Sequence, residues 1–148
     1  MKATDTAPTP ARLEEQLCFP LYAASREVIK QYRPYLDEAG ITYTQFITLQ
    51  ALYKCGCMSV KELGAMLYLD SGTLTPLLKS MERKGLVTRS RSREDERVLL
   101  VQLTAEGETL EAKCHDIPVK IRTLLNVPLD QVNIVSENLY RLLDLITE

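Results

Sequence analysis

The sequence predicts a mainly helical fold with one small β-hairpin. Most apolar residues recur at helical spacing, and capping residues precede several of these runs. Residues 86–103 differ, because two short apolar runs there flank a polar stretch. The 148 residues, of which 45% are hydrophobic, suffice for one domain with a buried core.

The helical part is expected to begin after a polar lead-in. Residues 1–10 are rich in Thr, Ala and Pro and predict a flexible N-terminus without the apolar block of a secretory signal. A first helix is expected from Leu13 to about Arg33. Pro20 lies inside it, so the helix either starts later or bends there, and Pro34 ends or kinks it.

Three helices are expected in the centre of the chain. The first runs from Tyr43 to about Cys55, with Thr42 as its N-cap. Ser59 caps the next, and a Glu three residues later completes a capping-box pattern. After a turn at residues 69–72, the helix from Thr73 to Lys84 has one apolar face and one face of Thr, Lys and Arg side chains. Two short helices joined by a tight turn are typical of a helix-turn-helix.

The hairpin follows this pair of helices. Residues 86–89 are expected to form one strand and residues 98–103 the return strand, with a polar tip between them. A long helix capped by Thr104 is expected to reach about Asn126, with an interruption near Pro118. Pro128 opens a final helix with apolar residues along one side. A hairpin directly behind a helix-turn-helix predicts a winged helix-turn-helix.

Residues 11–148 are interpreted as a single domain with two functional parts. The DNA-binding winged helix spans about residues 42–107, and the helices of residues 11–41 and 108–148 flank it. These helices have more apolar surface than a winged-helix core can cover, and each large side chain left exposed costs roughly 1.5–3 kcal/mol. We therefore expect a two-fold homodimer, which places two recognition helices ~34 Å apart and predicts a near-palindromic operator.

Positive charge is concentrated in the segment that is expected to bind double-stranded DNA. The net charge is −2, yet residues 71–97 hold seven basic and four acidic residues, against eleven and sixteen elsewhere. Local charge matters more to phosphate attraction than the total, and binding should weaken strongly with salt. The predicted contacts are Ser71, Thr73, Thr75 and Lys79 at the leading end of the recognition helix, Arg83 and Lys84 on phosphates, and Arg91 and Arg93 on the DNA backbone.

The remaining composition excludes several classes. No run approaches the ~20 apolar residues of a membrane span. The four cysteines are expected to be mostly reduced thiols of a cytoplasmic protein. We expect no cofactor and no metal, because Cys55 and Cys57 alone are too few ligands for zinc, and the adjacent Cys114 and His115 point to different helix faces.

The central motifs resemble those of the MarR family of winged helix-turn-helix regulators. The matching segments are Ser59-Val-Lys-Glu-Leu, Asp70-Ser-Gly-Thr-Leu-Thr, Met81-Glu-Arg-Lys-Gly-Leu-Val, and Asp95-Glu-Arg with Leu103-Thr-Ala-Glu-Gly. The resemblance covers the chain from about Leu13 to its C-terminus. It implies that Arg97 enters the minor groove from the wing and that Asp95 orients it.

A narrower resemblance involves the N-terminal part. Gln16-Leu-Cys-Phe-x-Leu-Tyr, Tyr32 and Thr42-Tyr-x-Gln are similar to the organic-hydroperoxide-sensing, OhrR-type branch. The resemblance implies that Cys18 is the sensing thiol and that Tyr32 and Tyr43 hydrogen-bond it. It also implies that the reduced dimer represses transcription and that oxidation by an organic hydroperoxide releases DNA.

General thiol chemistry agrees with this role for Cys18. Hydrogen bonds from two phenols favour a thiolate and lower the pKa of the thiol. A thiolate attacks a peroxide to give a sulfenic acid, which condenses with another thiol or a backbone nitrogen. Two-cysteine members of the branch keep a second reactive thiol further along the long helix, and Cys114 lies about two turns too early. A small external thiol is therefore the expected partner of oxidised Cys18.

Three other functions are compatible with parts of the sequence. A MarR-type repressor released by a small phenolic or drug-like ligand would use Tyr32 and Tyr43 to line a pocket at the dimer interface. A thiol peroxidase would use Cys18, but no recycling pair accompanies it. A winged helix that binds proteins is disfavoured by the basic wing. Outside its motif, Cys18 would be read as a buried, inert residue.

Overall fold

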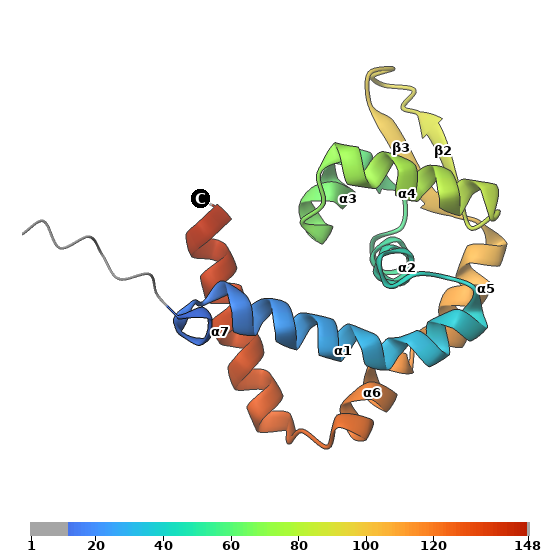
Figure 1. The fold of residues 1–148 in the computed structure, drawn as a ribbon. Helices are drawn as coiled ribbons and strands as arrows, with labels where there is room; N and C mark the ends of the chain where they lie inside the picture. The colour runs from blue at the N-terminus through green and yellow to red at the C-terminus, as the bar shows by residue number, and fades with distance from the viewer. Residues whose placement is uncertain (1–11, 148) are drawn as a thin grey trace, which may run out of the picture.

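The computed structural model describes residues 12–147, which form a helical frame with one three-stranded sheet (Figure 1). The elements are η1 (Leu13–Glu15), α1 (Cys18–Ala39), α2 (Tyr43–Cys55), β1 (Met58–Ser59), α3 (Val60–Leu67), α4 (Ser71–Arg83), β2 (Val87–Arg91), β3 (Leu99–Leu103), α5 (Ala105–Cys114), α6 (Ile117–Leu125) and α7 (Leu129–Thr147). The predicted fold class is confirmed. The segment 1–10, predicted to be flexible, lies outside the described residues. Within residues 12–147 no helix is long and apolar enough to cross a membrane.

Most helix starts follow the predicted capping residues. Thr42, Ser59 and Thr104 each accept a hydrogen bond from the backbone N–H three residues later, at 3.3, 3.1 and 3.0 Å. Asp70 caps α4 in the same way at 2.8 Å. Helix α4 therefore begins at Ser71, two residues earlier than predicted.

Helix α1 differs from the prediction at both ends. It begins at Cys18, so Pro20 lies in its first turn, where a missing N–H costs no helical hydrogen bond. The helix continues past the predicted end and through Pro34 to Ala39. Gly40, at φ +68°, ends it in the left-handed conformation that glycine adopts without strain.

The sheet has the order β1-β3-β2, and both pairings are antiparallel. The hairpin is the predicted wing, with Val87 opposite Leu103. Strand β1 was not predicted; its two residues pair with Val101 and Leu100 of β3. The expected interruption of the long helix is present, because α5 ends at Cys114 and α6 begins at Ile117, one residue before Pro118.

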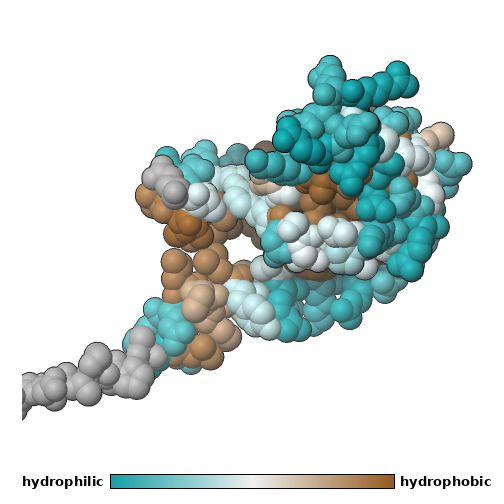
Figure 2. Space-filling view, turned by 90° about the horizontal axis from the view of Figure 1, so that it is seen from above, coloured by the Kyte–Doolittle hydropathy of each residue, from teal (hydrophilic) through white to brown (hydrophobic). Residues whose placement is uncertain are grey.

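Most of the buried core lies in the winged lobe, which we define as α2 to β3, and it extends to Leu36 of α1, Cys114 of α5 and Ile117 of α6. The largest fully buried apolar side chains are Phe46, Leu49, Leu52, Leu63, Leu74, Leu78, Met81, Val87 and Val101, with Ile121 of α6. Helix α7, in contrast, has no buried residue among those described. Figure 2 shows apolar side chains gathered on the side that holds α7 and the beginning of α1, away from the winged lobe.

Candidate DNA-binding interface and thiol site

Helix α4 separates a buried face from an exposed polar face. Leu74, Leu78 and Met81 are buried in the core. The predicted contact residues Ser71, Thr73, Thr75, Lys79 and Arg83 are all exposed. Figure 1 shows α4 on the outer side of the lobe next to the wing, so both elements are open to a ligand on one side.

The cations on this surface are not all equivalent. Lys79, Arg83 and Arg93 form no ion pair within residues 12–147 and remain available to phosphates. Lys84 was predicted to contact phosphate. Its ammonium instead donates to the carbonyl oxygen of Gly40 at 2.7 Å and to Gln45 Oε1 at 3.0 Å. Lys84 is thus held by two contacts within the chain while it stays exposed, and its contact with phosphate stays a prediction.

The wing holds Arg97 as the motif implied. Arg97 donates from Nε and Nη2 to the two carboxylate oxygens of Asp95, at 2.9 and 3.0 Å, and its side chain is 91% exposed. The same hydrogen bond lowers the pKa of Asp95, so the pair stays ionised. Arg91 donates to the carbonyl oxygens of Glu96 and Arg97 and so tightens the tip, a contact that the sequence did not predict.

Cys18 is the first residue of α1 and is exposed. Cys18 is therefore not buried within the single chain, and its reactivity stays a prediction. Its Sγ donates to Gln16 Oε1 at 3.7 Å. The residue before it, Leu17, is the N-cap of α1 and provides no side-chain cap.

Tyr32 and Tyr43 form an aromatic cluster with Phe46. The rings of the two tyrosines meet edge to face with centroids 5.2 Å apart, and Phe46 packs against both. Burial raises the pKa of Tyr32, and Tyr43 adds to this effect. Burial likewise raises the pKa of Tyr43, with a smaller effect from Tyr140. Both phenols therefore stay protonated at neutral pH and can donate hydrogen bonds.

The structure does not bring Cys18 to these tyrosines within one chain. Fourteen residues of continuous helix separate Cys18 from Tyr32. At about 1.5 Å per residue, the two lie roughly 21 Å apart along α1. The thiol–phenol contacts implied by the motif stay a prediction, and they require the thiol of one chain and the phenols of another.

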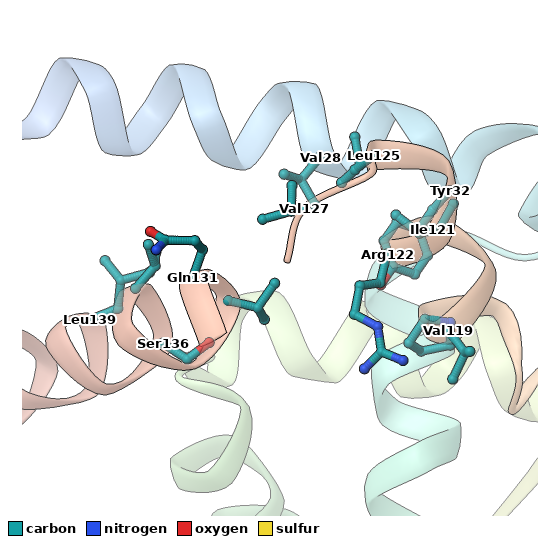
Figure 3. A pocket seen from close by; sticks show the side chains of 13 residues that line it. Val28, Tyr32, Val119, Ile121, Arg122, Leu125, Val127, Gln131, Ser136 and Leu139 are labelled. Atoms are coloured by element: carbon teal, nitrogen blue, oxygen red, sulfur yellow. The ribbon is translucent and has the colours of Figure 1, made fainter. Parts of the chain in front are cut away.

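A pocket of about 570 Å³ lies between α1, α6 and α7 (Figure 3). Val28 and Tyr32 of α1 form one wall, and α6 and α7 form the others. The lining is largely apolar; Arg122 and Gln131 are among its polar members. Tyr32 therefore belongs both to the aromatic cluster and to this pocket.

The other cysteines occupy different environments. Cys55 and Cys57 are exposed at the end of α2, whereas Cys114 is only 3% exposed. Burial raises the pKa of Cys114, with further contributions from Glu111 and Asp116, so its thiol is a poor nucleophile. Within residues 12–147, no three potential metal ligands lie together.

Comparisons with known proteins agree with this architecture. Residues 30–114 match the family of transcriptional regulators SarA/Rot. The organic hydroperoxide resistance transcriptional regulator of Bacillus subtilis (strain 168) is 50% identical over 133 residues, which cover 90% of each chain. The HTH-type transcriptional regulator SarZ of Staphylococcus aureus (strain USA300) is 41% identical over 127 residues, 86% of each chain.

Solved structures show the same likeness. Reduced AbfR bound to DNA has a TM-score of 0.76 and 34% identity, over 93% of this chain and 96% of that one. Overoxidised AbfR bound to DNA matches equally well. A mutant MarR from E. coli in complex with operator DNA has a TM-score of 0.76 and 27% identity, over 86% and 93% of the two chains.

These relatives settle the class of protein. They are transcriptional regulators, so the chain is a regulator and not an enzyme, and the thiol peroxidase alternative is excluded. The likeness to the curated relatives extends over nearly the whole of each chain. The chain belongs to the MarR-like family of winged helix-turn-helix transcriptional regulators, in the branch of the organic hydroperoxide resistance regulators.

Proposed function

We propose that the protein is a homodimeric repressor that leaves its operator when an organic hydroperoxide oxidises Cys18. The observation that carries this proposal is the exposed thiol at the start of α1, in a chain 50% identical to a hydroperoxide resistance regulator. The exposed face of α4 and the wing supply the DNA contacts.

The dimer is supported by the apolar surface outside the winged lobe. Leu129, Ile134, Val135 and Ile146 of α7 are each more than half exposed, and so are Leu17 and Tyr22 at the start of the chain's first long helix. A monomer rarely leaves an apolar surface of this extent in water. A second copy that packs its own α1 and α7 against these residues would cover them.

Such a dimer also explains how the sensing groups meet. The thiol and the tyrosines lie far apart on one copy of α1, so an antiparallel arrangement of two copies would place Cys18 of each near Tyr32 and Tyr43 of the other. Protonated phenols there stabilise a thiolate by hydrogen bonds.

The reaction follows from thiolate chemistry. The Cys18 thiolate attacks one oxygen of ROOH, the O–O bond breaks, and the products are a sulfenic acid and, after protonation, the alcohol ROH. A small thiol R′SH then displaces water and leaves a mixed disulfide on Cys18. This bulky adduct removes the thiolate that the phenols hold. A loss of about 2.7 kcal/mol of binding free energy is enough to weaken DNA binding ~100-fold.

The test uses DNA that the reduced protein selects from a random-sequence library. Cumene hydroperoxide with free cysteine should abolish binding by the wild type, and mass spectrometry should find the adduct on Cys18. Cys18→Ser should bind the same DNA and ignore the oxidant. If the Cys18→Ser variant releases DNA as the wild type does when it is treated with the oxidant, the proposal is refuted.

A second candidate function is favoured by the pocket beside Tyr32. A repressor released by a small phenolic or drug-like ligand would bind that ligand among Val28, Tyr32 and the apolar residues of α7. Salicylate is a suitable probe. If salicylate releases DNA from Cys18→Ser as well as from the wild type, ligand control replaces thiol control.

A further inference from the structure

A polar cluster joins the second half of the recognition helix to the corner between α1 and α2. We call Gly40, Gln45, Ser80 and Lys84 the corner cluster. Lys84 Nζ donates to the carbonyl oxygen of Gly40 and to Gln45 Oε1, and Gln45 Nε2 donates to Ser80 Oγ at 3.2 Å. Because Ser80 and Lys84 are one turn apart, they face the corner together.

Gln45 is the buried centre of this cluster. It is 4% exposed, and its Oε1 accepts from the backbone N–H of Thr42 at 3.2 Å as well as from Lys84. An amide engaged at both ends in a buried site has one favourable orientation, because turning it leaves polar atoms unpaired. The cluster therefore fixes α4 in direction as well as in distance.

The corner cluster lies on the same two helices, α1 and α2, as the tyrosines of the aromatic cluster. Tyr43 begins α2, two residues before Gln45, and Tyr32 lies on α1, which ends at Gly40. A displacement of a ring that tilted α1 or α2 would move the end of α1 or the first turn of α2. Lys84 and Gln45 are bonded to those two positions, so the displacement reaches α4.

We propose that Gln45 and Lys84 are positioning residues that couple the tyrosines to the angle of the recognition helix. This inference rests on the proposed function. In the reduced protein the corner cluster holds α4 at the angle that fits DNA. When the oxidised adduct displaces Tyr32 and Tyr43, the cluster shifts, and α4 leaves that angle.

The apolar core between α2 and α4 does not supply this coupling by itself. Phe46, Leu78 and Met81 hold the two helices together. The hydrophobic attraction that holds this core together is itself non-directional. Hydrogen bonds weaken steeply when their geometry is lost, so the polar contacts add a directional constraint to the packing.

The experiment compares Lys84→Met with Lys79→Met, which removes an exposed cation from the same helix. Two quantities are measured: the salt dependence of DNA binding by the reduced protein, and the ratio of Kd after cumene hydroperoxide and cysteine to Kd before. Lys79→Met should lower the slope of log K against log salt by about one and keep the wild-type ratio. Lys84→Met should keep the slope and reduce the ratio about tenfold or more.

The opposite pattern overturns the inference. If Lys84→Met lowers the slope of log K against log salt by about one, Lys84 is a phosphate contact. If the ratio of Kd after oxidation to Kd before is unchanged in this variant, Lys84 has no part in the coupling. If Lys84→Met does not fold, Ser80→Ala decides, because it removes the partner of Gln45 Nε2 and should also reduce the ratio. A wild type whose binding ignores the oxidant refutes the proposed function itself, and this is seen before any variant is compared.

Discussion

Glu82 of α4 and Arg89 of β2 are joined by three hydrogen bonds. Arg89 donates from Nη2 and Nε to Glu82 Oε2, at 2.7 and 3.2 Å, and its backbone N–H donates to Glu82 Oε1 at 3.2 Å. The Arg89 side chain is only 19% exposed, so water competes weakly for it. The recognition helix and the wing are therefore fixed to each other.

The first prediction concerns the pH dependence of this pair. Arg89 lowers the pKa of Glu82 below its ordinary 4.5, so the pair stabilises the fold fully above that value and is lost as the pH falls through the lower value in the folded state. Glu82→Gln should lower the urea midpoint at pH 7, and the gap to the wild type should narrow below about pH 4.5. Glu94→Gln, at the exposed wing tip, should show no such gap. A gap that does not change with pH would contradict the ion-pair interpretation.

The second prediction tests whether thiol and phenols come from different chains. Mixed dimers are prepared from one chain with Cys18→Ser and one with Tyr32→Phe and Tyr43→Phe. If the groups meet between chains, one complete site remains, and half of the wild-type number of fast-reacting thiols should be alkylated by iodoacetamide at pH 6.

The two parent homodimers serve as controls for this measurement. Neither has a complete site, so both should react slowly. If the mixed dimer is as slow as its parents, the proposed contacts between the thiol of one chain and the phenols of the other are absent.

The third prediction concerns the wing tip. Arg97→Ala should weaken operator binding by roughly 5–150-fold, because an arginine that reads a groove contributes about 1–3 kcal/mol. Asp95→Asn should cause a smaller loss, since it frees the Arg97 side chain without removing it. Fluorescence anisotropy at constant salt measures both. Arg141→Ala on α7 is the control; a loss as large as that of Arg97→Ala would show that general charge, not the wing, decides affinity.

Local signals in the sequence predicted most of the fold. Thr42, Ser59 and Thr104 cap helices through atoms three residues away, so their role is visible in a short stretch of sequence. The continuation of α1 through Pro34 was not predicted, because a proline usually ends or kinks a helix. The structure shows that this exposed proline is accommodated inside α1. Strand β1 exists only by pairing with β3, which lies some forty residues later.

The candidate site was predictable in its residue types and less so in its contacts. The exposure of the α4 face and the pairing of Asp95 with Arg97 followed from the motif. The contact of Lys84 with Gly40 spans 44 residues, and nothing in the local sequence distinguishes that lysine from Lys79. The distance between Cys18 and Tyr32 became apparent only when α1 proved to be one continuous helix.

The fourth prediction concerns Gly107 at the start of α5. A Cβ added there would overlap the carbonyl oxygen of Leu86 and press on the Leu103 side chain at 3.2 Å. Gly107→Ala should therefore lower the free energy of unfolding by about 3 kcal/mol, since overpacking in a tight site typically costs 1–3 kcal/mol and backbone cannot give way easily. Urea denaturation measures the loss. Glu108→Ala, exposed in the same turn, should change stability by less than about 0.5 kcal/mol.

The last prediction concerns the apolar face of α7. Val135 is 55% exposed in the single chain and lies beside Leu139 in the wall of the pocket. In a monomer, Val135→Glu would place a charge in water at almost no cost. In a dimer that covers this face, the same charge loses its hydration, and the variant should dissociate to a monomer at concentrations where the wild type sediments as a dimer.

Because a lone winged lobe contacts one half-site, that monomer should also bind a palindromic operator far more weakly than the wild type. Analytical ultracentrifugation and anisotropy on the same samples separate the two effects. Asn133→Glu, an exposed polar position on the same helix, provides the matched control and should remain dimeric. If Val135→Glu sediments like the wild type, α7 does not pack at the interface through this residue, and the trans arrangement of Cys18 with the tyrosines loses its structural support.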